Sequence, residues 1–215
     1  MQPTSLTSIV FTLTALENTS IPIDSGRILQ AAFLNWFKGQ HPELTAKLHD
    51  ANYQRPYTIS PLHGPFARER RWLHIKKDQQ GWFRLTGIEQ HFNQCVLESI
   101  ASYKHSPQPD DRRLIPGPVL QTPAKHDWVA ASSFERLLRH IQQQGEHLPE
   151  QVALSFKSPT CFIENKKSLP LPVPRFVFGY LANQWQMASP VALPIEDLQH
   201  FVESIQLAHA RIDTR

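Results

Sequence analysis

Residues 8–16 read Ser8-Ile-Val-Phe-Thr-Leu-Thr-Ala-Leu16, and polar and apolar side chains alternate along much of this stretch. β-Branched residues with a period of two are typical of a strand that has one buried face. Apolar residues then recur at helical spacing from Ile28 to Phe37, and Gly39 offers a stop. The chain is therefore predicted to open with a strand and a helix.

The segments that follow extend this pattern. A short helix is predicted from Pro42 to about Asp50, and a strand at Tyr57-Thr-Ile-Ser60. Two further strands, 71–76 and 82–86, flank the turn-forming sequence Asp78-Gln-Gln-Gly81, and this combination predicts a β-hairpin.

A helix and a strand complete the first unit. The helix contains Phe92, Val96 and Ile100, and two prolines demote the strand from Leu114 to Leu120 to a sheet edge. The order β-α-β-β-α-β is the ferredoxin-like arrangement, which RNA-recognition modules also use. We predict an α+β fold whose first ferredoxin-like domain spans residues 1–122.

A second ferredoxin-like domain is predicted over residues 123–215. Its expected elements are an amphipathic helix around 134–141, a strand at Val152–Phe156, an extended proline-rich segment with Pro174 opening a helix, and a last helix at 193–207. Strands that would finish this second unit are missing from the predicted elements, so the domain is predicted to be incomplete.

Composition limits the function classes. The 215 residues are 40% hydrophobic and 19% charged, which is typical of a folded chain, and the net charge of +3 permits an anionic partner. The N-terminus lacks the basic start of a signal peptide, and no apolar run reaches the length of a membrane span. A cytoplasmic protein without membrane contact is expected.

Several kinds of chemistry lack their motifs. No glycine-rich nucleotide loop and no GxSxG elbow occurs, and the carboxylates are too dispersed for a two-metal nuclease. Cys95 and Cys161 belong to no CxxC pair, so buried small hydrophobic residues are favoured over a zinc site or a disulfide. We expect neither a metal nor an organic cofactor.

Four segments resemble one known family in its expected order. They are Leu48-His-Asp50 with Tyr57-Thr-Ile-Ser-Pro-Leu62, then Phe156-Lys-Ser-Pro-Thr-Cys-Phe162, then Leu169-Pro-Leu-Pro-Val-Pro174, and finally Val177-Phe-Gly-Tyr-Leu181 with Trp185. The chain thereby resembles the CRISPR-associated repeat-processing endoribonucleases of the RAMP superfamily (the CRISPR-associated protein six family). The resemblance implies two ferredoxin-like domains side by side, with CRISPR repeat RNA held across or between them.

The activity implied is cleavage of repeat RNA into guide RNAs. RNA can be cut without metal because its own 2′-hydroxyl can attack the adjacent phosphate and form a 2′,3′-cyclic phosphate. This reaction needs a base, an acid and cationic donors to the phosphate. Histidine suits the proton transfer and arginine suits the phosphate.

Three residues are the candidate catalytic group. His49 and Arg55 flank the short connection before the strand that starts at Tyr57, and the resemblance places a catalytic histidine and an assisting basic residue near them. A tyrosine that some relatives carry on the first helix is absent from Phe33-Leu34-Asn35, so Tyr53 or Tyr57 is the proposed substitute. The alternative for His49 is a histidine that merely complements a helix dipole.

Basic residues form two candidate RNA-binding groups. The first contains Arg68, Arg70, Arg71 and Lys76 on and beside the predicted hairpin, with Trp72 and Trp82 interleaved, and the second contains Lys157, Lys166 and Lys167. Cations combined with aromatic side chains are typical of single-strand binding. An amphipathic hairpin or a solvated loop has the same composition.

The end of the chain leaves alternatives open. Relatives usually close with a glycine-rich loop, and none follows the last predicted helix here. A truncated coding region, a domain of a reverse transcriptase–integrase fusion and a degenerate homologue all fit. A non-catalytic RNA-binding or assembly module, with other CRISPR effector or adaptation proteins as partners, is therefore the second hypothesis. An unrelated ferredoxin-like interaction domain is the third. An open sheet edge at Val152–Phe156 would favour a homodimer.

Overall fold

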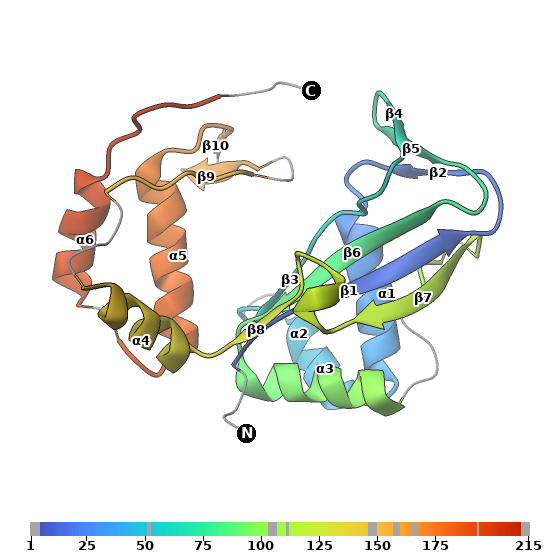
Figure 1. Ribbon diagram of the computed structural model, residues 1–215, viewed down its shortest axis with the longest axis horizontal. Coiled ribbons are helices and arrows are strands. Elements are labelled where there is room, and N and C mark those ends of the chain that lie inside the picture. The colour runs from blue at the N-terminus through green and yellow to red at the C-terminus, as the bar shows by residue number, and fades with distance from the viewer. Residues whose placement is uncertain are drawn as a thin grey trace. The chain divides into compact units, whose positions relative to one another are not determined.

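The computed structural model describes residues 5–50, 53–102, 107–110, 112–145, 150–156, 160–164, 167–192 and 194–211, and the side chains of residues 195 and 196 are left aside. The chain divides into two compact units, Met1–Gln143 and Gln144–Arg215 (Figure 1). No helix among these residues is long and apolar enough to cross a membrane.

The first unit is built on an antiparallel sheet. Its strands lie in the order β3 (Tyr57–Ile59), β6 (Gln80–Gly87), β1 (Leu6–Ala15) and β7 (Leu114–Leu120), and β8 (Ala130–Ser132) pairs with the start of β1. The main strands of this sheet are β1, β3, β6 and β7 in chain order. β1 lies between β6 and β7, the third and fourth of these strands, which is the ferredoxin-like order. The predicted α+β, ferredoxin-like fold class is confirmed.

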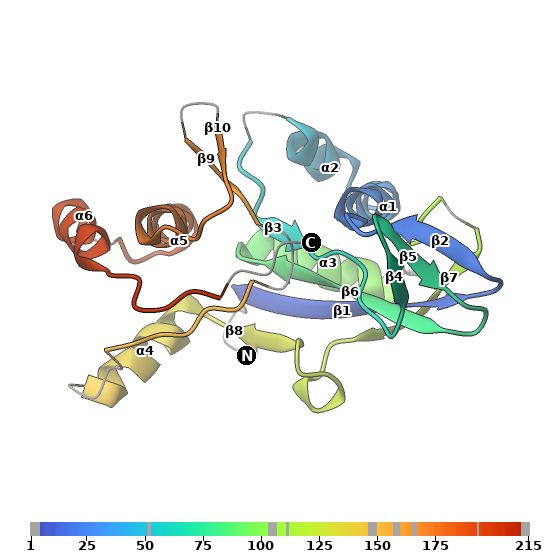
Figure 2. The ribbon, with the colours of Figure 1, turned by 90° about the horizontal axis from the view of Figure 1, so that it is seen from above.

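Helices cover one face of this sheet. Figure 2 shows α1 (Gly26–Lys38), α2 (Pro42–His49) and α3 (Gln90–Ser102) on one side, and the loop before β8, with the short 3-10 helix η1 (Pro123–Lys125), on the other. The core between helices and sheet is aromatic, and its largest fully buried side chains are Phe11, Phe33, Phe37, Phe83 and Phe92. Alternate residues of β1 point into it, as the sequence pattern predicts.

The predicted hairpin between residues 71 and 86 is wrong. β5 (Trp72–Ile75) pairs with β2 (Thr19–Pro22) and β4 (Ala67–Glu69), whereas β6 pairs with β1 and β3. The ladder runs on from one sheet to the next, because Asp78 donates its backbone N–H to the Ala15 carbonyl at 2.8 Å. The pairing of β1 with β6 thus continues into the pairing of β2 with β5, as one long two-stranded ribbon. Residues 76–79 bend this ribbon, and the chain does not reverse direction there.

The reversal occurs before this bend. β4 and β5 pair from Glu69 opposite Trp72, so Arg70 and Arg71 form the tip of a tight hairpin. Arg70 has φ +51°, in the left-handed region that such a turn requires. This β4–β5 hairpin presents two adjacent guanidinium groups at its tip.

The second unit contains a short β-ribbon and two helices. β9 (Phe162–Glu164) pairs with β10 (Lys167–Leu169), and α5 (Pro174–Ala188) contacts α6 (Ile195–Ser204). Pro174 opens α5, which confirms that prediction. Residues 150–156 form no strand, so the strand predicted at Val152–Phe156 is wrong.

The boundary predicted at residue 123 stays a prediction. β8 adds to the first unit's sheet, and α4 (Phe134–Gln144) follows it directly. The buried Phe134 donates its backbone N–H to the Ser5 hydroxyl at 3.3 Å, so the first turn of α4 is attached beside the start of β1.

Candidate active site and basic hairpin

His49 is the last residue of α2 and is exposed to solvent. Its neighbour Leu48 is fully buried in the core, so the end of the helix is fixed while the imidazole stays outside. Lys47 lies in the same last turn, where the partial negative charge of the helix end favours cations. The local sequence therefore produces a rigidly based and accessible histidine.

Arg55 returns to this helix end. Its Nε donates a hydrogen bond to the Leu48 carbonyl oxygen at 3.2 Å. That oxygen is one of the carbonyls that a helix leaves without an intrahelical partner, so Arg55 caps α2. The structure thus brings the guanidinium of Arg55 beside the residue that precedes His49.

Tyr57 lies at the start of β3 and belongs mainly to the core. Its ring stacks on Phe92 at a centroid distance of 5.2 Å and contacts Phe33 at 5.5 Å. Its hydroxyl accepts a hydrogen bond from Gln30 Nε2 at 3.1 Å. Burial raises the pKa of the phenol above its ordinary value of 10.0, and the Gln30 hydrogen bond and the positive charge of Arg55 oppose this shift. Tyr57 is therefore a buried, protonated phenol at neutral pH, and burial makes it a weaker acid than an exposed tyrosine.

The residues of the first candidate RNA-binding group are all exposed to solvent. Arg68 is on β4, Arg70 and Arg71 form the hairpin tip, and Lys76 stands at the bend of the ribbon. Trp72, which follows the tip, is 48% exposed. In the second group, Lys167 is exposed on β10, and Lys157 and Lys166 lie outside the described residues.

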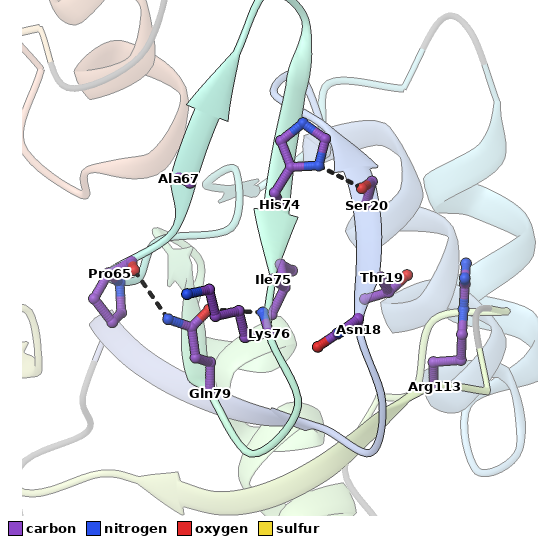
Figure 3. A pocket seen from close by; sticks show the side chains of 10 residues that line it. All are labelled: Asn18, Thr19, Ser20, Pro65, Ala67, His74, Ile75, Lys76, Gln79 and Arg113. Atoms are coloured by element: carbon purple, nitrogen blue, oxygen red, sulfur yellow. Dashed lines mark hydrogen bonds between the residues drawn. The ribbon is translucent and has the colours of Figure 1, made fainter.

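A hollow of about 580 Å³ lies beside this bend. Figure 3 shows His74 and Lys76 on the β5 side and Asn18, Thr19 and Arg113 across from them. His74 Nδ1 is 2.8 Å from the Ser20 hydroxyl, and Gln79 Nε2 donates to the Pro65 carbonyl at 3.3 Å. Three lining side chains, His74, Lys76 and Arg113, can carry a positive charge. Polar groups that form hydrogen bonds also line the hollow.

The sequence missed a cluster on the helix-free face of the sheet. Trp82 of β6 stacks with His63 at 4.5 Å and packs edge-on against His126 and Trp128. The Arg84 guanidinium lies 4.4 Å from the centre of the Trp128 ring. Burial, with the charges of Arg68 and Arg84, lowers the pKa of His63 below its ordinary value of 6.5. His63 is therefore a neutral stacking partner at pH 7.

Comparison with known proteins gives structural matches only. No protein-family profile matches the chain. No curated protein sequence matches it either. Among solved structures, the product complex of Cas6 (TTHB231) matches with a TM-score of 0.63 at 23% identity, covering 93% of this chain and 71% of that one.

Two further structures agree with this match. Thermus thermophilus Cas6 (TTHB231) has a TM-score of 0.60 at 23% identity, over 93% of this chain and 68% of that one. The substrate mimic complex of Cas6 (TTHA0078) has a TM-score of 0.61 at 19% identity, over 92% and 69%. The resemblance seen in the sequence thus reappears at the level of structure. This chain has the fold of the CRISPR-associated Cas6 proteins.

Proposed function

We propose that this protein binds CRISPR repeat RNA and cleaves it as an endoribonuclease. Two of the similar structures are a product complex and a substrate mimic complex of Cas6 proteins, which supports a fold able to hold such a substrate. The observation that carries the proposal is the hydrogen bond from Arg55 to the Leu48 carbonyl. It brings an arginine guanidinium close to an exposed histidine, which supports the proposed pairing of a cation with a proton-transfer group.

The proposed reaction uses the RNA's own nucleophile. His49 accepts the proton of the 2′-hydroxyl, and the 2′-oxygen forms a bond to the adjacent phosphorus. The bond from phosphorus to the 5′-oxygen breaks, leaving a 2′,3′-cyclic phosphate upstream and a 5′-hydroxyl downstream. Arg55 donates to the non-bridging oxygens, whose charge grows in the transition state. The departing 5′-oxygen takes a proton from an acid, for which the candidates are Tyr53, which is 37% exposed, and Tyr57, which is buried in the core.

Incubation with repeat RNA in EDTA tests this mechanism. We expect cleavage to persist, because no step uses a metal-bound nucleophile. We also expect the upstream product to end in a 2′,3′-cyclic phosphate, detected by its resistance to phosphatase until acid opens the ring. Magnesium-dependent cleavage that leaves a 3′-hydroxyl would exclude the mechanism.

The basic β4–β5 hairpin supports the RNA-binding part of the proposal independently of the chemistry. Arg70 and Arg71 lie at its tip, and both are exposed. A chain that bound RNA through this hairpin without cutting it would be the non-catalytic module, and the absence of any cleaved product would favour that second function.

Replacing both tip arginines by alanine should weaken binding of repeat RNA and flatten its salt dependence. Each phosphate contact to a duplex contributes about 0.9 to the slope of log K against log salt concentration. The double variant should therefore lose up to about 1.8 from that slope. Lys38→Ala at the end of α1 is the matched surface control, and its slope should equal that of the wild type. An unchanged slope in the double variant would remove the hairpin from the interface.

A further inference from the structure

A cluster of metal-binding side chains lies where α2 begins, at the opposite end of that helix from His49. His41 is the residue before α2, and Cys95 and Glu98 are on α3. One ligand atom of each of these three residues lies within 4.8 Å of the others. His41 and Cys95 are thus far apart in sequence and are joined only by the packing of the two helices.

Helical spacing brings a fourth donor to the same place. His91 precedes Cys95 by four residues and Glu98 follows it by three, so all three side chains share one face of α3. His91 Nε2 is 3.9 Å from Cys95 Sγ. α3 therefore presents a nitrogen, a sulfur and a carboxylate in a row, facing His41.

His41 carries the observation that points to a ligand. Its Nε2 is buried and has no hydrogen-bond partner among the described residues. A buried polar atom left without a hydrogen-bond partner destabilises the folded state. The ring is held by contact with Phe37 at a centroid distance of 4.8 Å. A bond from Nε2 to a metal ion would satisfy this nitrogen.

We propose that His41, Cys95 and Glu98, with His91 as the fourth ligand, bind one zinc ion. Imidazole, thiolate and carboxylate are all zinc ligands, and sulfur disfavours magnesium and calcium. Zinc bonds of about 2.0–2.3 Å set tetrahedral ligands roughly 3.5 Å apart, so the cluster has to close by about 1 Å. His91 and Glu98 are exposed, and their side chains can rotate to make this adjustment.

A supporting hydrogen bond is already present. Gln94 Nε2 donates to Glu98 Oε1 at 3.0 Å, which leaves the other carboxylate oxygen for the metal. Outer hydrogen bonds of this kind orient ligating carboxylates. A zinc ion here would connect the start of α2 to α3. The sequence predicts no metal, because the four ligands form no CxxC or paired-histidine motif.

The site is separate from the proposed catalytic group. His41 and His49 are eight residues apart along α2, or about 12 Å at the rise of an α-helix. The proposed ion therefore contacts none of the candidate catalytic groups, and the tests of the zinc site do not depend on the proposed function.

Cobalt(II) titration of the purified, chelator-treated chain tests the site without an activity assay. We expect one cobalt per chain, with the visible bands of tetrahedral cobalt and a near-ultraviolet thiolate charge-transfer band, both abolished by an equivalent of zinc. Cys95→Ala should remove the charge-transfer band. Cys161→Ala is the matched control, because Cys161 is the exposed cysteine, and its spectrum should equal that of the wild type.

Two further variants keep the test decisive if Cys95→Ala fails to fold. Glu98→Ala changes an exposed residue and should weaken cobalt binding by about tenfold or more, since even outer-shell losses cost that much. Zinc should raise the Tm of the wild type and leave that of His41→Ala unchanged. A cobalt spectrum without a thiolate band, or one lost in Cys161→Ala, would overturn the proposal. Equal affinity in Glu98→Ala and the wild type would do the same.

Discussion

His49→Ala should lower the single-turnover rate of repeat RNA cleavage by about 10²- to 10⁴-fold, the usual contribution of a general base. The imidazole is exposed at the end of α2, so its removal should leave the fold unaffected. The Kd for repeat RNA should stay near that of the wild type, because a proton-transfer group acts only in the transition state. Cleavage under enzyme excess and equilibrium binding measure the two quantities separately.

Arg55→Ala should differ from this variant in a diagnostic way. The guanidinium would contact the phosphate in the ground state as well as in the transition state, so both affinity and rate should fall. It also caps Leu48, so a small loss of stability is expected. His200→Ala, which removes an exposed histidine from α6, is the control for His49→Ala and should cleave at the wild-type rate. A wild-type cleavage rate in His49→Ala would show that His49 is not the general base.

Local signals in the sequence predict the elements whose causes are local. The sequence predicts β1 from β-branched residues and partial alternation, α1 from its apolar spacing, and the start of α5 from Pro174. The hairpin prediction failed because the residues that favour a tight turn also permit a bend. Asp78 has φ +65°, and whether the chain then reverses or continues depends on the partner strands β1 and β2, which are distant in sequence.

The features of the candidate site likewise fall into those that the local sequence predicts and those that depend on residues far apart in the chain. His49 and Arg55 are six residues apart, so their proximity is foreseeable from the sequence, and the Leu48 hydrogen bond supplies the geometry. Burial of Tyr57 among Phe33 and Phe92 depends on the packing of two helices that are remote from it. Cys95 is buried, as predicted, whereas Cys161 is exposed, contrary to prediction. No spacing rule could have joined His63, Trp82 and Trp128, which come from two loops and a strand.

Replacing the 2′-hydroxyl of the scissile nucleotide by hydrogen should stop cleavage completely, the largest effect expected of any single change. The proposed nucleophile is that oxygen, and neither His49 nor Arg55 supplies another. Binding should be nearly unchanged, because the substitution removes one hydroxyl from a contact surface dominated by phosphates. The measurement is a gel assay at saturating protein, with a 2′-deoxy substitution one nucleotide away as the control that should be cut normally.

The deoxy substrate also distinguishes a zinc ion that stabilises α2 from a metal ion that takes part in the reaction. EDTA treatment alone does not make this distinction. EDTA would strip the zinc proposed at His41, Cys95 and Glu98, so a loss of activity in EDTA can arise from a loosened α2 as well as from metal-dependent chemistry. The deoxy substrate leaves that zinc in place and removes only the nucleophile. If the fully metal-loaded protein cuts the deoxy substrate, a water molecule is the nucleophile, and the 2′-hydroxyl mechanism is wrong. The proposed mechanism expects two results together: the metal-loaded protein leaves the deoxy substrate uncut, and His41→Ala cuts normal RNA in EDTA. The nucleophile is then the 2′-hydroxyl of the RNA, and the reaction needs no metal ion.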